Sequence, residues 1–338
     1  MRTLAVAALL CACSPADAPS SAKRTGDSAP TTISSVTTSD DARPTDHTST
    51  DTPATTTTPP SEATVIEEGV VLGAADLLDI LFVVDNSCSM GATQDRLAAT
   101  APAIAPSLSA VDDFHVGVIT ADMVNSWYSG RLQRIGSQLW IDETCSDLPR
   151  ALEDVFQQGI WGDFQERGLD AAMAAIDVLG ATRHAGFVRP GSSLHIVILS
   201  DEDDDSAVGW TAFADWLDAL RLEHPVVEFH SIVLFEATPE NPPEARPGEQ
   251  YLQTTDAVGG ESVDLNSATF DLDMQGLTDA ITDGRVHCPA EEPMLDTVEF
   301  TDADGLVVSD EGWWLHEFTG CFVFEEGSQE LTLRYKTL

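Results

Sequence analysis

Basic residues are scarce in this chain of 338 residues. Lysine and arginine together number 16, against 57 aspartates and glutamates, and lysine occurs only at Lys23 and Lys336. The net charge of −41 repels nucleic acid and anionic membrane surfaces, so we expect no nucleic-acid partner. This acidity is typical of adaptation to a salty habitat, and a specific acidic binding face is the alternative.

The motifs of several common enzyme classes are also absent. The sequence contains no G-x-S-x-G, no H-E-x-x-H, no Walker loop and no G-x-G-x-x-G. Cysteine is rare, with six residues, and no two of them have the C-x-x-C spacing of a zinc or redox site. We therefore expect a protein that is not an enzyme.

The N-terminus has the features of an export signal. Met1-Arg2 is a minimal basic start, and the apolar stretch at residues 3–10 is too short to span a bilayer as a helix. The sequence up to Cys13 resembles a bacterial lipobox, in which residues 1–12 are removed and Cys13 is lipidated. An ordinary signal peptide is the alternative. Ser14 replaces the aspartate that commonly retains lipoproteins in the inner membrane. The resemblance therefore implies a lipid anchor in the outer membrane or at the cell surface, with the periplasm also possible.

Residues 13–67 are predicted to be a disordered tether. They are rich in Ser, Thr, Pro, Asp and Ala, and residues 14–64 contain no Leu, Phe, Tyr or Trp. Such a segment buries too little apolar surface to offset the entropy lost on ordering. It would hold the folded part of the chain away from the membrane.

Residues 68–287 alternate between two hydrophobic patterns. Short apolar runs typical of buried strands alternate with helical patterns, which predicts an α/β fold with a mainly parallel central sheet flanked by helices. A break or kink is expected in the first helical stretch, at Pro102 and Pro106. The main strands are expected at 79–85, 114–120, 194–200 and 226–235, with shorter ones at 132–135, 138–141 and 262–265, and helices at 92–110, 164–179, 213–220 and 274–281.

Residues 288–338 are predicted to form a small β-rich module. Asp304-Gly305 lies between two strand-like segments, at 297–300 and 306–308, and so predicts a hairpin. Alternating patterns at 321–324 and 331–335 indicate further strands. A module this short needs a disulfide or packing against the main domain.

Four cysteines remain after the predicted lipidation site. An even number in an exported chain suggests two disulfides, and four cysteines permit three pairings. We prefer Cys88–Cys145 and Cys288–Cys321, because each pair lies within one predicted module.

A carboxylate and two hydroxyls follow the first predicted strand of the main domain. Asp85, Ser87 and Ser89 come directly after its apolar run. In open α/β sheets, ligands bind at the carboxyl ends of the strands. Oxygen ligands in a tight turn suit a hard divalent cation such as Mg²⁺. This pattern resembles the metal-ion-dependent adhesion site (MIDAS) of von Willebrand factor A (vWA) domains.

The resemblance covers residues 70–285 and implies two further ligands. One is an aspartate after the fourth strand, for which Asp201 is suitably placed. The other is a threonine just before a helix, where this chain has Asp163; Gln165 and Glu166 are alternatives in another register. An added carboxylate would partly fill the site and shift its preference toward Ca²⁺, which takes more oxygen ligands.

In vWA domains with this site, the metal keeps one position for a carboxylate of the ligand. The resemblance thus implies a surface-anchored adhesion or assembly protein that binds a protein ligand through an acidic side chain. One alternative is a scaffold with a vestigial site, in which Ser87 and Ser89 only cap the next helix. The other is a hydrolase using Asp85, Asp201 and a metal, although no nucleophile–base pair accompanies them. The sequence does not indicate an oligomeric state.

Several other polar residues lie near the predicted strands. Asp122 follows the second strand and is a candidate for the outer shell of the site. The acidic run at 201–206 is interpreted as a solvated loop, with a second cation site as the alternative. His195 and His230 fall within apolar strands and are interpreted as ordinary strand residues.

Overall fold

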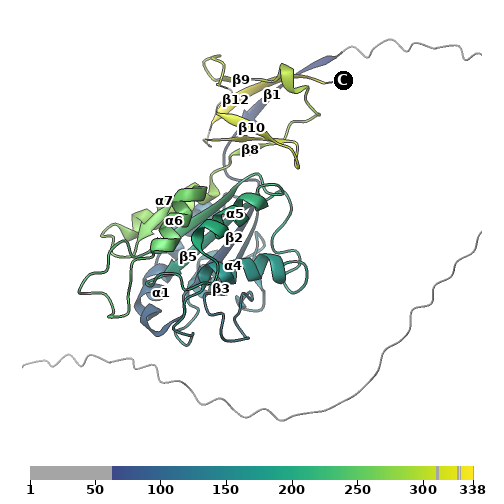
Figure 1. Ribbon diagram of the computed structural model, residues 1–338. Helices are drawn as coiled ribbons and strands as arrows, with labels where there is room; N and C mark the ends of the chain where they lie inside the picture. Colours follow the sequence, from purple (N-terminus) through teal and green to yellow (C-terminus); the bar gives the residue numbers. More distant parts are fainter. Residues whose placement is uncertain (1–62, 310–311, 326, 328, 338) are drawn as a thin grey trace, which may run out of the picture. The chain divides into compact units, whose positions relative to one another are not determined.

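The computed structural model describes residues 63–309, 312–325, 327 and 329–337 (Figure 1). The predicted signal peptide, the lipidation site Cys13 and almost all of the predicted tether lie outside these residues. Among the described residues, none of the helices combines the length and apolar character needed to span a bilayer.

The main domain is built on one six-stranded sheet. Its strands follow the order β4-β3-β2-β5-β6-β7, and all pairs are parallel except β3 with β4. Numbered along the chain, this is the doubly wound order 3-2-1-4-5-6, whose direction of winding reverses between β2 and β5. The Rossmann-like α/β prediction is confirmed. The strands are β2 Leu77–Val84, β3 Asp113–Thr120, β4 Trp140–Ile141, β5 Ser193–Ser200, β6 Val227–Val233 and β7 Ser262–Asp264.

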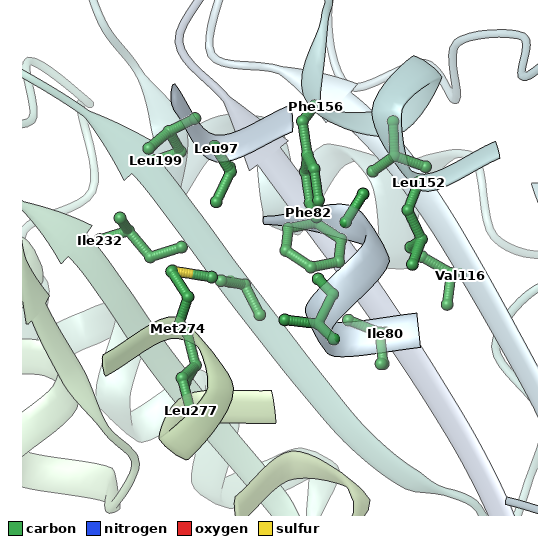
Figure 2. Close-up of a cluster of buried hydrophobic side chains, with 14 of the residues drawn as sticks. Ile80, Phe82, Leu97, Val116, Leu152, Phe156, Leu199, Ile232, Met274 and Leu277 are labelled. Carbon is green, nitrogen blue, oxygen red and sulfur yellow. The ribbon is translucent and has the colours of Figure 1, made fainter. Parts of the chain in front are cut away.

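Helices cover both faces of this sheet. Successive side chains of a strand point to opposite faces, so Phe82 and Leu81 of β2 lie in separate apolar clusters. Figure 2 shows the cluster that contains Phe82, with Leu97 and Met274 from the helices packed over the strands. Helices α1, α2, α3 and α7 contribute to this cluster, and α4, α5 and α6 to the other. The bounds are α1 Gly91–Ala98, α2 Ala101–Leu108, α3 Leu148–Phe156, α4 Gly168–Met173, α5 Trp210–Leu220, α6 Glu249–Val258 and α7 Phe270–Thr282.

Some predicted elements are shorter than expected. The helical stretch at 92–110 divides into α1 and α2, with Pro102 in the first turn of α2, where a missing N–H costs no hydrogen bond. Pro106 lies inside α2. The predicted strand at 132–135 is wrong, because only an isolated bridge joins Ile135 to Gln138.

The β-rich module includes a strand from far upstream. β1 Thr64–Val71 pairs antiparallel with β12 Glu330–Thr337 along its whole length. The predicted boundary between residues 67 and 68 therefore falls inside a strand. The remaining strands are β8 Val286–His287, β9 Glu299–Asp302, β10 Trp313–His316 and β11 Cys321–Phe324, arranged in the sheets β1-β12-β9 and β10-β11-β8.

Only one of the two predicted disulfides is present. Cys288 and Cys321 are bonded, as predicted. Cys145 is a free cysteine, so the predicted Cys88–Cys145 bond is wrong. Cys88 opens a 3-10 turn after β2, whereas Cys145 packs at the edge of an apolar cluster before α3. Sequence separation and an even count did not reveal these different surroundings.

Removing the Cys288–Cys321 bond is expected to destabilise the β-rich module. The bond closes a loop with a sequence separation of 33, which corresponds to about 3.7 kcal/mol of chain entropy in the unfolded state. In a Cys288→Ser/Cys321→Ser variant, hydrogen exchange of the β11 and β12 amides should accelerate, while β5 serves as the internal control. Unchanged protection in β11 would show that the bond contributes little.

Candidate divalent cation site

The candidate site lies between the carboxyl ends of β2 and β5, where the winding of the sheet reverses. Asp85 follows β2 and Asp201 follows β5. The backbone N–H of Asp85 donates to the carbonyl of Leu199 (2.8 Å), which holds the two strand ends together. This crevice is where ligands bind in doubly wound sheets.

Four of the five predicted ligands come together there. Asp85 is fully buried and accepts hydrogen bonds from the Ser87 N–H and the Ser200 hydroxyl, both at 2.7 Å. The Ser87 and Ser89 hydroxyls are 3.0 Å apart, and Ser89 donates to Oδ1 of Asp201 at 3.0 Å. Asp85, Ser87, Ser89 and Asp201 thus form one continuous set of oxygen atoms.

The helix-capping explanation of the two serines does not fit this geometry. Ser87 occupies the position before the 3-10 turn Cys88–Met90, but its side chain makes no capping hydrogen bond. Its hydroxyl lies instead against that of Ser89. Both hydroxyls are therefore positioned toward the crevice side of the loop, with the aspartates.

Asp163 is not placed with these residues. It is partly exposed, and its Oδ1 accepts a hydrogen bond from the Gln165 N–H (3.1 Å). Its own N–H donates to Oδ2 of Asp122 (3.3 Å). Glu166, the alternative register, is 1 % exposed, and its carboxylate lies close enough to Asp85 for each to perturb the pKa of the other. In the structure Glu166, and not Asp163, therefore lies beside Asp85.

The turn that carries Glu166 is fixed by contacts with distant loops. The Gly162 N–H donates to the carbonyl of Asn86 (2.8 Å), and Glu166 forms an isolated bridge with Asp122. Asp122 is itself buried and caps its own loop by accepting from Val124 N–H (2.8 Å). Asp122 thus contacts Glu166 through the backbone bridge, and it lies where an outer-shell residue was suggested.

Within the described residues, the buried carboxylate of Glu166 has no hydrogen-bond donor at either oxygen to stabilise its negative charge. Burial, and then the negative charge of Asp85, raise the pKa of Glu166 to about 11. Burial also raises the pKa of Asp85, and burial together with the charge of Asp85 raises the pKa of Asp201 to about 7. The site is therefore a cluster of buried acids that either binds protons or needs a cation.

The acidic run after β5 is not a solvated loop as expected. Asp201, Glu202 and Asp204 are all buried. Asp204 accepts hydrogen bonds from the Tyr251 hydroxyl (3.0 Å) and the Leu169 N–H (3.3 Å), and so connects the start of α4 to α6. This run is therefore part of the scaffold of the site.

Large apolar side chains surround the loops of the site. Trp127 and Trp161 are 78 % and 85 % exposed, and Val124 and Phe164 are also exposed. They belong to the loop after β3 and the turn before Glu166, which the Asp122–Glu166 bridge joins. These residues could not be predicted from the sequence, because isolated aromatic residues in loops carry no periodic signal.

Comparisons with solved structures return proteins of low sequence identity to this chain. The chain is similar to a von Willebrand factor type A protein from Catenulispora acidiphila (12 % identity, 80 % of this chain and 64 % of that one, TM-score 0.40). It is also similar to the pilus adhesin SpaC from Lactobacillus rhamnosus GG (12 % identity, 80 % of this chain and 41 % of that one, TM-score 0.39). A third similar structure is that of proximal thread matrix protein 1 from the mussel byssus, with a zinc-occupied MIDAS motif (14 % identity, 64 % of this chain and 48 % of that one, TM-score 0.38).

The chain spans less than two thirds of each of these proteins. No protein-family model and no curated protein matches it. The assignment of a doubly wound α/β domain therefore depends on the chain's own sheet order.

Proposed function

We propose that this protein is a non-enzymatic, surface-anchored vWA-like module that holds a divalent cation and uses it to bind a protein ligand, in adhesion or assembly. The observation that carries the proposal is the unpartnered, buried carboxylate of Glu166 beside Asp85. Two buried acids that face each other cannot both ionise unless a cation lies between them.

The donor atoms suit a hard cation. The carboxylates of Asp85, Glu166 and Asp201 and the hydroxyls of Ser87 and Ser89 would supply oxygen only, which Mg²⁺ and Ca²⁺ prefer. Three carboxylates carry more negative charge than the ion neutralises, and this favours Ca²⁺, which takes six to eight oxygens. When bound, the ion would offer a positive charge and an open coordination position to a ligand.

The same geometry supports binding and not catalysis. A serine becomes a nucleophile when an adjacent base takes its proton. Here the Ser87 and Ser89 hydroxyls hydrogen-bond to each other, and the Ser89 hydroxyl donates to Asp201. Asp201, the last acceptor in this series of hydrogen bonds, is itself proposed to hold the metal. The cation would therefore act as a bridge to the partner.

The partner proposed for this surface is a protein with an acidic side chain set among apolar residues. Its carboxylate would contact the cation, and its apolar residues would cover Trp127, Trp161 and Phe164, since exposed apolar patches mark interaction sites. Glu166 opposes the partner's negative charge. Glu166→Gln should therefore retain the cation and strengthen ligand binding.

Asp85→Ala is expected to abolish cation binding with little change in fold, because it removes the central carboxylate of the cluster. Calorimetric titration with Ca²⁺ and with Mg²⁺ measures this directly. Asp163→Asn is the matched control, since it removes a nearby carboxylate that lies outside the cluster, and it should bind like the wild type. Equal affinities in the wild type and Asp85→Ala would refute the cation site.

Partner capture distinguishes a metal bridge from a scaffold. The tethered protein is used to isolate surface proteins in the presence of Ca²⁺, of Mg²⁺ or of EDTA. A partner retained only with a cation, and lost from Asp85→Ala, supports the proposal. A partner that remains bound in EDTA supports a scaffold with a vestigial site. Lipid labelling that disappears in Cys13→Ala tests the proposed anchor.

A further inference from the structure

Two histidines and a glutamate gather in the sheet, away from the strand ends that carry the candidate cation site. His195 lies on β5, and Glu228 and His230 lie on β6. The register pairs His195 with Glu228 and Val197 with His230. Because side chains alternate along a strand, all three residues project to one face of the sheet, that of the cluster in Figure 2.

The three side chains approach one another as closely as metal ligands do. Nδ1 of His195 and Nε2 of His230 are 3.0 Å apart, and Oε2 of Glu228 is 3.6 Å from each of them. A point equidistant from the corners of this triangle lies about 2.0 Å from each atom, within the range of zinc–nitrogen and zinc–oxygen bonds.

We propose that His195, Glu228 and His230 form a second metal site, for a transition-metal ion such as Zn²⁺. Two imidazoles and one carboxylate are a ligand set that suits zinc better than Mg²⁺ or Ca²⁺. The site is distinct from the oxygen-only cluster at the carboxyl ends of β2 and β5, and it does not depend on the function proposed for that cluster.

The surroundings orient the three ligands. Arg285 donates to Oε1 of Glu228 (2.6 Å), which leaves Oε2 directed toward the two rings. Metal-binding carboxylates are typically held by such a second contact. His195 and His230 are almost completely buried, and the hydrogen bond between them holds the two rings in place.

Without a metal, one proton occupies the space between the rings. The Glu261 N–H donates to Nδ1 of His230 (2.9 Å), so the ring proton of His230 lies on Nε2 and is donated to Nδ1 of His195. An incoming Zn²⁺ displaces this proton. For the ring to stay neutral with the ion on Nε2, the proton must move to Nδ1 of His230, at the expense of the Glu261 contact.

A surface hollow borders Glu228 and is the proposed entry path for the ion and for a fourth ligand. It has a volume of about 310 Å³, and its lining includes Glu228, Gly260, Glu261 and Arg285. A water molecule entering from this side would complete a four-coordinate ion. Arg285 directly precedes β8. The ion would therefore stabilise the packing of β5 and β6 near the point where the chain continues into the β-rich module.

The test uses the full chain in an Asp85→Asn background, which disables the oxygen cluster. Titration with Zn²⁺ should show one ion per chain, and anomalous X-ray scattering at the zinc edge should place it among the three side chains. With Co²⁺ as a substitute, the visible absorption of a four-coordinate imidazole site should appear.

Glu228→Gln should weaken zinc binding by more than about tenfold. Glu223→Gln, at an exposed glutamate outside the cluster, is the matched control and should bind normally. Circular dichroism confirms that both variants fold. An anomalous peak elsewhere, or equal affinity in the two variants, would overturn the proposal, and so would a Co²⁺ complex without the imidazole spectrum.

Discussion

Without divalent cations, raising the pH from about 5 to about 8 is expected to lower the free energy of unfolding by several kcal/mol. Glu166 is the main cause, because its pKa is about 11 in the folded chain and 4.5 is its ordinary value. Between these values the folded state binds a proton that the unfolded state has released. Stability is therefore complete below the lower pKa and is lost as the pH rises, by about 1.4 kcal/mol per pH unit for one such group.

Asp201 adds to this loss over the lower part of the range. Burial and the charge of Asp85 raise its pKa from 3.8 to about 7, so its contribution falls away between those values. A bound cation reverses the balance, because it favours the ionised carboxylates of the folded state and binds the unfolded chain weakly. Saturating Ca²⁺ should therefore flatten the pH dependence.

Urea denaturation at several pH values, with excess chelator and with Ca²⁺, measures this effect. Glu166→Gln should show a shallower slope in chelator, because the variant has no proton to lose. Asp163→Asn should keep the wild-type slope, since Asp163 is partly exposed and bonded to its own turn. Identical slopes in the wild type and Glu166→Gln would mean that Glu166 does not titrate as its burial implies.

The part of the site that could be predicted from sequence lies next to the strands. Asp85 and Asp201 each follow an apolar run, and parallel strands end at a common edge. Ser87 and Ser89 are close along the chain to Asp85. Local pattern was therefore sufficient for Asp85, Ser87 and Ser89, whereas Asp201 was placed beside them by the resemblance to vWA domains.

Glu166 needed tertiary information. The choice between Asp163 and Glu166 depends on how the turn at 162–167 is held against Asn86 and Asp122, and no periodicity records those contacts. The same reason explains β1, whose hydrogen-bonding partner β12 lies at the other end of the chain.

The cluster of His195, Glu228 and His230 also required the register of the sheet. Each histidine lies in an apolar strand, and each alone is consistent with an ordinary core residue. Only the pairing of His195 with Glu228 brings the three side chains to one place.

Asp79→Ala is expected to cost about 3–5 kcal/mol of stability, the usual cost of breaking a buried ion pair. Asp79 is fully buried near the start of β2. Its carboxylate accepts from Arg189 three times, at Oδ2 from the backbone N–H (2.6 Å) and at Oδ1 from Nε (2.9 Å) and Nη2 (2.7 Å). Removing the aspartate leaves most of the guanidinium shielded from water without its main partner.

Chemical denaturation in saturating Ca²⁺ measures this loss apart from the cation site. Asp113→Asn is the control, because Asp113 also contacts Arg189 but is half exposed, and exposed pairs contribute about 1 kcal/mol or less. A change below about 1 kcal/mol in Asp79→Ala would contradict the expectation. Adding Arg189→Met should recover part of the loss, since the unpaired charge is then removed.

Cation affinity should nevertheless survive in folded Asp79→Ala protein. Asp79 lies six residues before Asp85, about 20 Å along an extended strand, so the ion pair and the cation cluster occupy opposite ends of β2. This result would separate the contribution of the buried ion pair to stability from the proposed cation binding by the acids after the strand. Calorimetric titration of the folded variant should give the wild-type affinity, whereas Asp85→Ala should give none.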